Sequence, residues 1–519
     1  MAMNPALRAS LPQPSLARNV ISNWGALAFG ILVSFFLSPF VVHHLGSTGY
    51  GVWVLIVSLT SYLQFVDLGV RNAVTRFVSK FHAQGDDDSA SRILTTALGF
   101  FTLAGLAAVI AGAMAALFAV RLFEIPADYQ RQVKIALFLA GGNVAAWLIK
   151  GAFAGCLAGL QRFVAMNTID IALGAARAAG VVLTLMFGGG LVGLALVELG
   201  YSLAGCLAQL SLSFRIYPQL RMRLGLFTRQ HLGMILSFSV FSFLLDVAME
   251  LIYYTDVLII GVFLPIGEVG FFSIAANPRN YARNLVAGLA NAMTPAASKL
   301  DAQTRYDELK GFLRVGARNA SLIMLPIAVT FILRGRTFID LWMGHEYGEL
   351  CGQVLRVLFV AVLFSAACQV AQSVVLGIGK HKAVVPVLLA QGVCNLVLAV
   401  ALVRSRGIVG VAWATAIPSL ATSLLFWPWF MRSTLGFPIR DFVMSAWVRP
   451  GVSVLPFALC TYAFEQMLPP SNLMIFFLQV GVAVPLAFFG AWVFCLEAHE
   501  CESYARKARE ILSLVNAKN

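Results

Sequence analysis

The stretch SFSVFSFLLDVAMELIYYTDVLIIGVF (237–263) decides the fold, because it exceeds the roughly twenty apolar residues that a helix needs to cross a bilayer. Three acids lie within it, namely Asp246, Glu250 and Asp256. The next apolar run, FFSIAANPRNYARNLVAGLANAM (271–293), carries Arg279 and Arg283. Ionisable side chains at bilayer depth are costly, so they normally face a bundle interior or a water-filled cavity. These five charged residues are therefore the first candidates for a functional site.

The composition of the whole chain indicates a membrane protein. Of its 519 residues, 59% are hydrophobic and 12% are charged, and the mean hydropathy is +0.82. A soluble globular protein of this length does not need so much apolar surface. The sequence therefore predicts an all-α, polytopic membrane protein. The net charge of +13 does not indicate nucleic acid as a partner, because the basic residues lie in short loops between apolar segments.

Apolar runs predict about fourteen transmembrane helices. The candidate spans are 19–44, 49–68, 93–120, 134–157, 163–187 and 191–214, then 234–263, 268–297, 317–334, 353–377, 383–403 and 408–431, and finally 444–464 and 473–496. This pattern predicts two parallel six-helix lobes plus two C-terminal helices. The expected boundaries are a disordered tail at 1–18, an N-terminal lobe at 19–214, a connector at 215–233, a C-terminal lobe at 234–431, two extra helices at 444–496 and a tail at 497–519.

The distribution of positive charge orients these spans. Most of the 37 Lys and Arg fall in the tails, the connector and the alternate loops that would lie on the same side as the N-terminus. Loops on the other side, such as GSTG (46–49) and FGGG (187–190), carry no positive charge. Because cytoplasmic loops are enriched in Lys and Arg, both termini are predicted to be cytoplasmic.

An internal repeat relates the two predicted lobes. Leu45 matches Leu264, and at the same offset the block Asn-Ala-x-Thr-x-x-x-Ser-Lys-x-x-Ala-Gln occurs at 72–84 and again at 291–303. Nearly the same offset relates GLVGLA (190–195) to GIVGVA (407–412). Such self-similarity indicates duplicated halves. Because each half would hold an even number of spans, the halves are predicted to be parallel, with binding near the midplane where they meet.

Further polar residues inside the predicted spans extend the candidate site. The candidates for binding an anionic head group are Arg279, Arg283, Lys150 and Arg177. Candidates for proton coupling are Asp246, Glu250, Asp256 and Glu198, and candidate cavity amides are Asn291, Gln369, Gln372, Gln391 and Asn395. Arginines form forked hydrogen bonds with phosphate, and a carboxylate in a half-dry cavity can exchange a proton. The alternative is that acids and bases pair and only hold helices together.

No signature of an enzyme, metal site or cofactor is present in the sequence. GIGKHK (377–382) lacks the remaining residues of a phosphate-binding loop, and neither GxSxG nor HExxH occurs. The eight cysteines form no CxxC pair, and the run His499, Glu500, Cys501 is a weak metal candidate only. The sequence therefore predicts a protein that is not an enzyme and binds no metal or cofactor.

The chain resembles the polysaccharide and O-antigen flippases of the multidrug/oligosaccharidyl-lipid/polysaccharide exporter superfamily. Five segments carry the resemblance: LGSTGYGVWVLIVSLTSYLQFVDLGVRNAVTRFVSKFHAQGD (45–86), GLQRF (159–163), TDVLIIGVFLPIGEVGFFSIA (255–275), FIDLWMG (338–344) and GIGK (377–380). The resemblance implies a flippase of the bacterial inner membrane that moves a polyprenyl-pyrophosphate-linked oligosaccharide by alternating access. It also implies a cationic lumen, which Lys150, Arg177, Arg279 and Arg283 could line. Its expected partners are the lipid-linked oligosaccharide, the bilayer and other glycan assembly proteins.

Three other functions remain open at the level of sequence. Lipid II flippases share fourteen spans but resemble this chain less, because its first span carries no arginine. Proton- or cation-coupled drug antiporters of the same superfamily often place an acid in the seventh helix, as Asp246 and Glu250 are placed, but usually stop at twelve spans. A membrane glycosyl polymerase or ligase typically needs a large outer loop, and the outer loops predicted for this chain are short.

Overall fold

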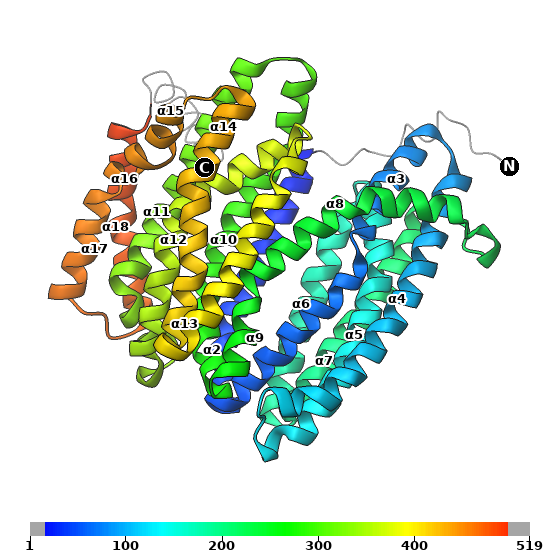
Figure 1. Ribbon diagram of the computed structural model, residues 1–519, viewed down its shortest axis with the longest axis horizontal. Helices are drawn as coiled ribbons and strands as arrows, with labels where there is room; N and C mark the ends of the chain where they lie inside the picture. The colour runs from blue at the N-terminus through cyan, green and yellow to red at the C-terminus, as the bar shows by residue number, and fades with distance from the viewer. Residues whose placement is uncertain (1–15, 497–519) are drawn as a thin grey trace, which may run out of the picture. The chain divides into compact units, whose positions relative to one another are not determined.

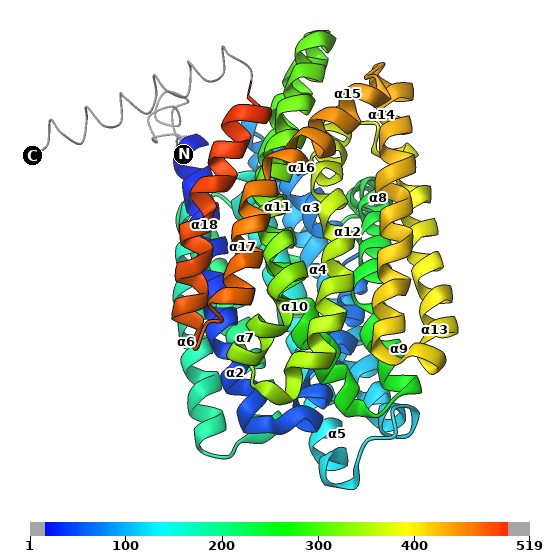
Figure 2. The ribbon, with the colours of Figure 1, turned by 90° about the vertical axis from the view of Figure 1, so that its left-hand side faces the viewer.

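The computed structural model describes residues 16–496, which form helices joined by short loops (Figures 1 and 2). Within that range there is no β-strand, so the predicted all-α class is confirmed. The predicted tail at 497–519, with the His499, Glu500, Cys501 run, lies outside the described residues, as do the first fifteen residues of the predicted 1–18 tail.

The chain forms two compact units. The first unit comprises Met1–Ser273 and Leu388–Gly407, within the described range. Its helices are α2 (Leu16–Leu63), η1 (Gln64–Asp67), α3 (Val70–Gln84), α4 (Asp87–Leu122), α5 (Ala127–Gly159), α6 (Phe163–Met186), α7 (Gly190–Ile216), η2 (Leu224–Leu226), α8 (Arg229–Tyr253), α9 (Thr255–Phe263) and the start of α10 (Ile266–Ala302). Figure 1 shows α4, α5 and α7 side by side. Their apolar core includes Phe101, Leu148 and Phe153.

The second unit comprises Ile274–Val387 and Ile408–Asn519, again within the described range. It contains most of α10, then α11 (Tyr306–Trp342), α12 (His345–Gly377), η3 (His381–Ala383), part of α13 (Val385–Ala421), η4 (Thr422–Phe426), α14 (Trp427–Leu435), α15 (Ile439–Val443), η5 (Met444–Val448), α16 (Arg449–Ser453), α17 (Leu455–Met467) and α18 (Leu473–Phe494). In Figure 2, α17 and α18 lie beside α11. The boundaries between the two units fall inside α10 and α13. They do not test the lobe boundaries expected from the sequence, which stay predictions.

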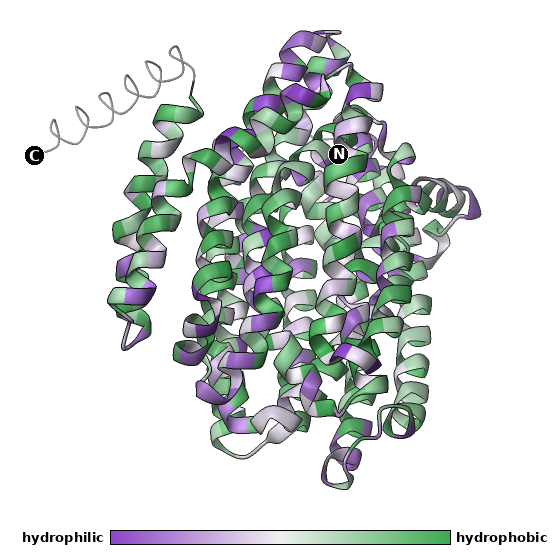
Figure 3. Cartoon of the chain, turned by 60° about the vertical axis from the view of Figure 1, so that its left-hand side comes forward, coloured by the Kyte–Doolittle hydropathy of each residue, from purple (hydrophilic) through white to green (hydrophobic). Residues whose placement is uncertain are grey.

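The helices carry enough apolar surface to cross a membrane several times. Nine helices of the described part are long and apolar enough to be spans, or ten if the bent pair Ile439–Ser453 and Leu455–Met467 is one span. Figure 3 shows hydrophobic residues along the helix bodies and many hydrophilic residues near their ends. The chain is therefore a multi-pass membrane protein. The count of fourteen spans stays a prediction.

Backbone breaks divide several of the long helices. Gly46 interrupts α2 with φ 70° and ψ 172°, and Gly407 interrupts α13 with φ 57° and ψ −147°. These conformations favour glycine because a side chain would clash with the backbone. The predicted span 234–263 is likewise divided, since Tyr254 lies between α8 and α9. The breaks at Gly46 and Gly407 fall between predicted spans, whereas the break at Tyr254 lies inside one predicted span.

Side-chain oxygens cap the first turns of two helices. Asp86 precedes α4, and its carboxylate accepts a hydrogen bond from the backbone N–H of Ser89 at 2.9 Å. Hydrogen bonds from the side chain and backbone of Ser89 hold the pKa of Asp86 below its ordinary value. Asn472 caps α18 in the same way, accepting from the N–H of Ile475 at 2.9 Å.

Equivalent residues of the sequence repeat meet within the first unit. An ideal Cβ on Gly51 would lie 2.1 Å from the carbonyl oxygen of Ile266, and one on Gly270 would lie 2.8 Å from that of Ser47. Gly51 and Gly270 are equivalent in the repeat, and so are Ser47 and Ile266. Such a reciprocal contact is typical of a two-fold relation. The structure thus supports an internal duplication and explains why both helices keep a small residue here.

A second pair of contacts repeats once in each unit. A Cβ on Gly159 would lie 2.7 Å from the carbonyl oxygen of Thr75, in the first unit. In the second unit, a Cβ on Gly377 would lie 2.5 Å from the carbonyl oxygen of Thr294. Both glycines are near the end of a helix and both threonines belong to the repeated Asn-Ala-x-Thr block. The repeat therefore preserves a close helix–helix approach as well as a sequence pattern.

Replacing Gly51 tests the reciprocal contact. We expect Gly51→Ala to lower the free energy of unfolding by about 1–3 kcal/mol, because the added methyl group forces the backbones of α2 and α10 apart. Gly270→Ala should have a smaller effect, since its clash is less severe. Thermal unfolding of the purified protein in detergent measures both. Gly30→Ala, where no other atom lies within 4 Å, is the control, and equal stability of all three variants would contradict the account.

Candidate functional site

A charged cluster joins α5, α6 and α7 in the first unit, and we call it the polar network. Lys150 of α5 donates from Nζ to Oδ1 of Asp170 on α6 at 3.1 Å. Arg177 of α6 donates from Nε to both carboxylate oxygens of Glu198 on α7, at 2.8 and 2.9 Å, and its Nη2 also donates to Glu198 Oε1. Two bases and two acids are thus paired across three helices.

Tyr201 joins the two ion pairs into one network. The Lys150 Nζ lies 5.2 Å from the centre of the Tyr201 ring, and the Arg177 guanidinium carbon lies 5.9 Å from it. Both distances allow a cation–π attraction. One aromatic ring therefore contacts both cations. A change in one ion pair can shift this ring and so alter the other ion pair.

Helical spacing explains why these side chains meet. Asp170 and Arg177 are two turns apart and lie on one stripe of α6. On α7, Glu198, Tyr201 and Gly205 follow at intervals of three and four residues, which also places them on one face. A Cβ on Gly205 would approach the Lys150 side chain to 3.2 Å, so the glycine leaves room for the lysine chain.

The polar network is neutral overall and partly open. Its four charged side chains are between 13% and 36% exposed, with Lys150 the least and Asp170 and Arg177 the most exposed. Fully buried ion pairs serve packing, but partly exposed pairs can exchange partners. A guanidinium held in a fork by a carboxylate also has the geometry to hold a phosphate. The network can therefore bind an anion if Glu198 releases Arg177.

A second group of polar residues surrounds the break between α8 and α9. The Tyr62 hydroxyl and the Thr255 hydroxyl are hydrogen-bonded at 2.6 Å, and the adjoining Asp256 is fully buried. Asn395 of α13 donates from Nδ2 to the carbonyl oxygen of Ile252 at 3.1 Å. The last carbonyls of a helix lack partners in a following turn, so Asn395 satisfies one of them. This contact gives the predicted cavity amide Asn395 a structural role.

The role of Asn395 can be tested by stability. We expect Asn395→Leu to lower the free energy of unfolding by about 1–3 kcal/mol, because the Ile252 carbonyl group stays buried without its donor. Thermal unfolding in detergent measures the loss. Cys394→Ala, at the exposed neighbouring position, should leave the unfolding temperature unchanged. Equal unfolding temperatures for Asn395→Leu and the wild type would remove this role.

The other candidates from the sequence differ in burial. Asp246 is exposed and Glu250 is partly buried on α8, whereas on α10 Arg279 is buried and Arg283 is partly buried. The remaining candidate amides also differ in burial. Asn291 is exposed, whereas Gln369, Gln372 and Gln391 are partly buried. Their predicted roles in head-group binding, proton coupling and cavity lining stay predictions. Of the candidates from the sequence, the polar network brings together Lys150, Arg177 and Glu198.

Two members of the polar network were not among the residues that the sequence singled out. Asp170 lies inside the predicted span 163–187, and its spacing of two turns from Arg177 is the signal that could have found it. Tyr201 is uncharged at neutral pH, so a search for charged residues inside the spans would not find it.

A cluster in the second unit was also missed. Arg334 of α11 is 0% exposed and donates to Glu465 of α17 at 2.7 Å and to Gln479 of α18 at 2.6 Å. The Thr337 hydroxyl donates to Glu465 as well, and the Phe476 ring lies 4.7 Å from the guanidinium carbon. The backbone of Arg334 leaves the helical conformation, with φ −120° and ψ 16°. The cluster fastens α17 and α18 to α11, and its residues stood at span ends where a charge is unremarkable.

Known proteins resemble the chain both in sequence and in fold. A family model described as polysaccharide biosynthesis protein matches residues 16–301. The uncharacterized membrane protein EpsK of Bacillus subtilis (strain 168) is 20% identical over 449 residues, which cover 85% of this chain and 88% of EpsK.

Solved structures share the fold. The lipid II flippase MurJ, in an inward closed conformation, is similar with a TM-score of 0.70 at 14% identity, over 92% of this chain and 98% of MurJ. An inward-facing multidrug resistance MATE family transporter of the MOP superfamily is similar with a TM-score of 0.67 at 15% identity, over 80% of this chain and 99% of the transporter. Both likenesses concern the arrangement of helices.

Proposed function

The chain belongs to the polysaccharide biosynthesis protein family, and we propose that it is a flippase for a polyprenyl-pyrophosphate-linked oligosaccharide. The cargo is a repeat unit of an O-antigen, a capsule or an exopolysaccharide. It crosses the bacterial inner membrane by alternating access, with both termini of the protein in the cytoplasm. The family and the apolar helices support this proposal, and the family favours a glycan cargo over a drug or lipid II.

The observation that carries the proposal is the forked Arg177–Glu198 pair inside a membrane protein. Charged groups within spans are costly and mark transport pathways. In the polar network the guanidinium of Arg177 is partly exposed and its donors are already aligned for a planar acceptor. A pyrophosphate can replace the Glu198 carboxylate on this fork, while the Lys150 ammonium supplies a second positive charge nearby. Arg279 and Arg283 are also proposed to bind the head group.

The acids are proposed to divide into two roles. Glu198 holds the Arg177 fork in place when no cargo is bound, as its three hydrogen bonds from Arg177 indicate. Proton coupling is then assigned to Asp246, Glu250 and Asp256 on α8 and α9. Transport driven by an imposed pH gradient in vesicles supports this assignment. Transport that is indifferent to the gradient removes it.

Deleting the gene in its own host tests the proposed function. We expect surface glycan to disappear, while the lipid-linked oligosaccharide accumulates on the cytoplasmic face of the membrane. Restoring the gene should restore display. If the glycan were polymerised and displayed normally without the protein, or if lipid-linked oligosaccharide failed to form, the protein would not be the flippase.

A further inference from the structure

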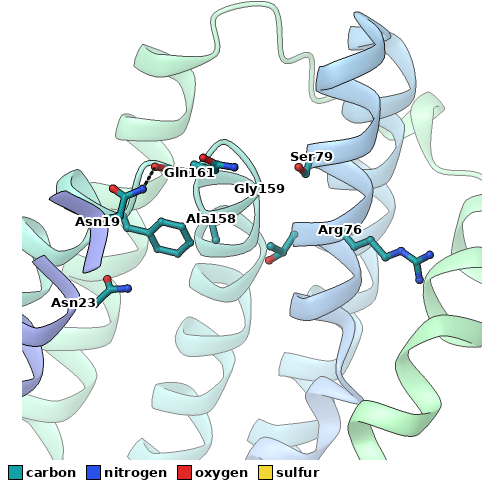
Figure 4. A pocket seen from close by; sticks show the side chains of 9 residues that line it. Asn19, Asn23, Arg76, Ser79, Ala158, Gly159 and Gln161 are labelled. Atoms are coloured by element: carbon teal, nitrogen blue, oxygen red, sulfur yellow. Dashed lines mark hydrogen bonds between the residues drawn. The ribbon is translucent and has the colours of Figure 1, made fainter. Parts of the chain in front are cut away.

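A polar crevice lies in the first unit, apart from the polar network. It has a volume of about 470 Å³, within the range of ligand sites in proteins, roughly 300–1,000 Å³. The start of α2, one face of α3 and the turn between α5 and α6 form it (Figure 4). Its lining residues are Asn19, Asn23, Thr75, Arg76, Ser79, Ala158, Gly159, Gln161 and Phe163.

Asn19 lines this crevice and carries a buried hydrogen-bond acceptor. Its side chain is 6% exposed, and its Nδ2 donates to the backbone carbonyl oxygen of Gln161 at 3.3 Å. A carbonyl oxygen only accepts, so the amide nitrogen of Asn19 must face Gln161 and its Oδ1 must face elsewhere. That Oδ1 is buried and accepts no hydrogen bond from the residues that the structure describes. A buried acceptor of this kind calls for a ligand that donates.

Donor groups also line this crevice. The Asn23 Oδ1 already accepts from Nδ2 of Asn167 at 2.6 Å, so the amide nitrogen of Asn23 is the group left to donate. The Ser79 side chain is exposed at the rim, and a hydroxyl both donates and accepts. The ring of Phe163 adds an apolar surface. The crevice thus combines acceptors, donors and one aromatic face.

We propose that this crevice binds a sugar residue, and that the sugar belongs to the lipid-linked oligosaccharide of the proposed function, on which this inference rests. Each hydroxyl of a sugar donates and accepts, so neighbouring hydroxyls match Asn19, Asn23 and Ser79 together. The ring C–H groups of the sugar pack on Phe163. The crevice would then select the glycan, while the polar network holds the pyrophosphate.

The alternative ligand, a phosphate, fits the crevice less well. An ionised phosphate only accepts hydrogen bonds, so it would place its charge against the Asn19 Oδ1. The one cation of the lining is Arg76, and Figure 4 shows its side chain directed away from Asn19 and Gln161. The negative charge of a phosphate and the direction of the Arg76 side chain therefore both favour a neutral, hydroxyl-bearing ligand.

Saccharide binding by the purified full-length protein tests the proposal. The probe is the free oligosaccharide released by mild acid from the host's own surface polysaccharide, titrated by calorimetry in detergent. We expect Asn19→Ala and Ser79→Ala each to weaken binding about tenfold, the effect of losing a hydrogen bond to a buried partner or a hydroxyl. Ser79 is exposed, so its variant should fold normally.

Controls separate this site from the rest of the molecule. Ser298→Ala changes the residue equivalent to Ser79 in the other half of the repeat and should leave binding unchanged. Inorganic pyrophosphate should fail to displace the saccharide. Wild-type protein that binds no saccharide, Asn19→Ala and Ser79→Ala variants that bind as the wild type does, or displacement by pyrophosphate would each overturn the proposal.

Transport distinguishes failure of this inference from failure of the proposed function. If reconstituted wild-type protein moves the lipid-linked oligosaccharide but saccharide binding does not depend on Asn19 or Ser79, the crevice has another role. If the wild-type protein moves no lipid-linked oligosaccharide at all, the proposed function itself fails.

Discussion

Arg177→Ala should lower the rate of lipid-linked oligosaccharide transport in proteoliposomes by at least about a hundredfold. The variant removes the fork that is proposed to hold the pyrophosphate. Charge-assisted hydrogen bonds contribute about 1.5–3 kcal/mol each and about 1.4 kcal/mol is a tenfold change, so losing two gives this magnitude. The assay follows the cargo from one leaflet to the other over time.

Three matched variants show whether the fork is responsible. Arg177→Lys keeps the charge but loses the fork, so an intermediate rate is expected. Glu198→Gln keeps the guanidinium and should transport faster than Arg177→Ala. Arg121→Ala removes an exposed arginine at the end of α4 and should transport at the wild-type rate. A wild-type rate for Arg177→Ala, at normal protein levels, would exclude the polar network from head-group binding.

Glu465→Ala should lower the free energy of unfolding by about 3–5 kcal/mol, because it leaves the Arg334 guanidinium buried without its carboxylate. Arg334 is fully buried, and Gln479 alone cannot neutralise its charge. Thermal and denaturant unfolding in detergent measure the change. We also expect proteolysis near α17 and α18 to become faster, since the cluster fastens these helices to α11.

An exposed ion pair near the start of α11 is the control for this effect. Arg305 and Glu308 are paired, and both side chains are about half exposed, so Glu308→Ala should cost only about 0–1 kcal/mol. The double variant Arg334→Met/Glu465→Leu should recover most of the stability, because it removes both buried charges. Equal losses for Glu465→Ala and Glu308→Ala would show that the buried pair has no special role.

The sequence predicted the class and the family well, because both rest on signals spread over the whole chain. Apolar runs set the all-α class, which the structure confirms. The resemblance carried by segments such as 45–86 is confirmed by the family model, by EpsK and by the fold of MurJ. The repeat was visible in sequence because both copies keep the residues of one close helix approach, Gly159 on Thr75 and Gly377 on Thr294.

Individual contacts could not be predicted, since they join helices that are distant in sequence. The sequence named Lys150 and Arg177 as head-group candidates, but it did not show that each pairs with an acid on another helix. Asn395 stays a predicted cavity amide, and its hydrogen bond to the carbonyl oxygen of Ile252, beside a break in the helix, was not visible in the sequence. Spacing along one helix predicts which residues share a face, and it does not predict what lies opposite that face.

Transport in proteoliposomes is the most direct test of the central claim. Purified protein is reconstituted with a fluorescent polyprenyl-pyrophosphate-linked oligosaccharide, and a reagent that cannot cross the bilayer reports how much cargo has reached the outer leaflet. We predict rapid transfer with the wild-type protein and slow transfer with Arg177→Ala and with empty liposomes. Transfer by the wild-type protein no faster than in empty liposomes would contradict the account.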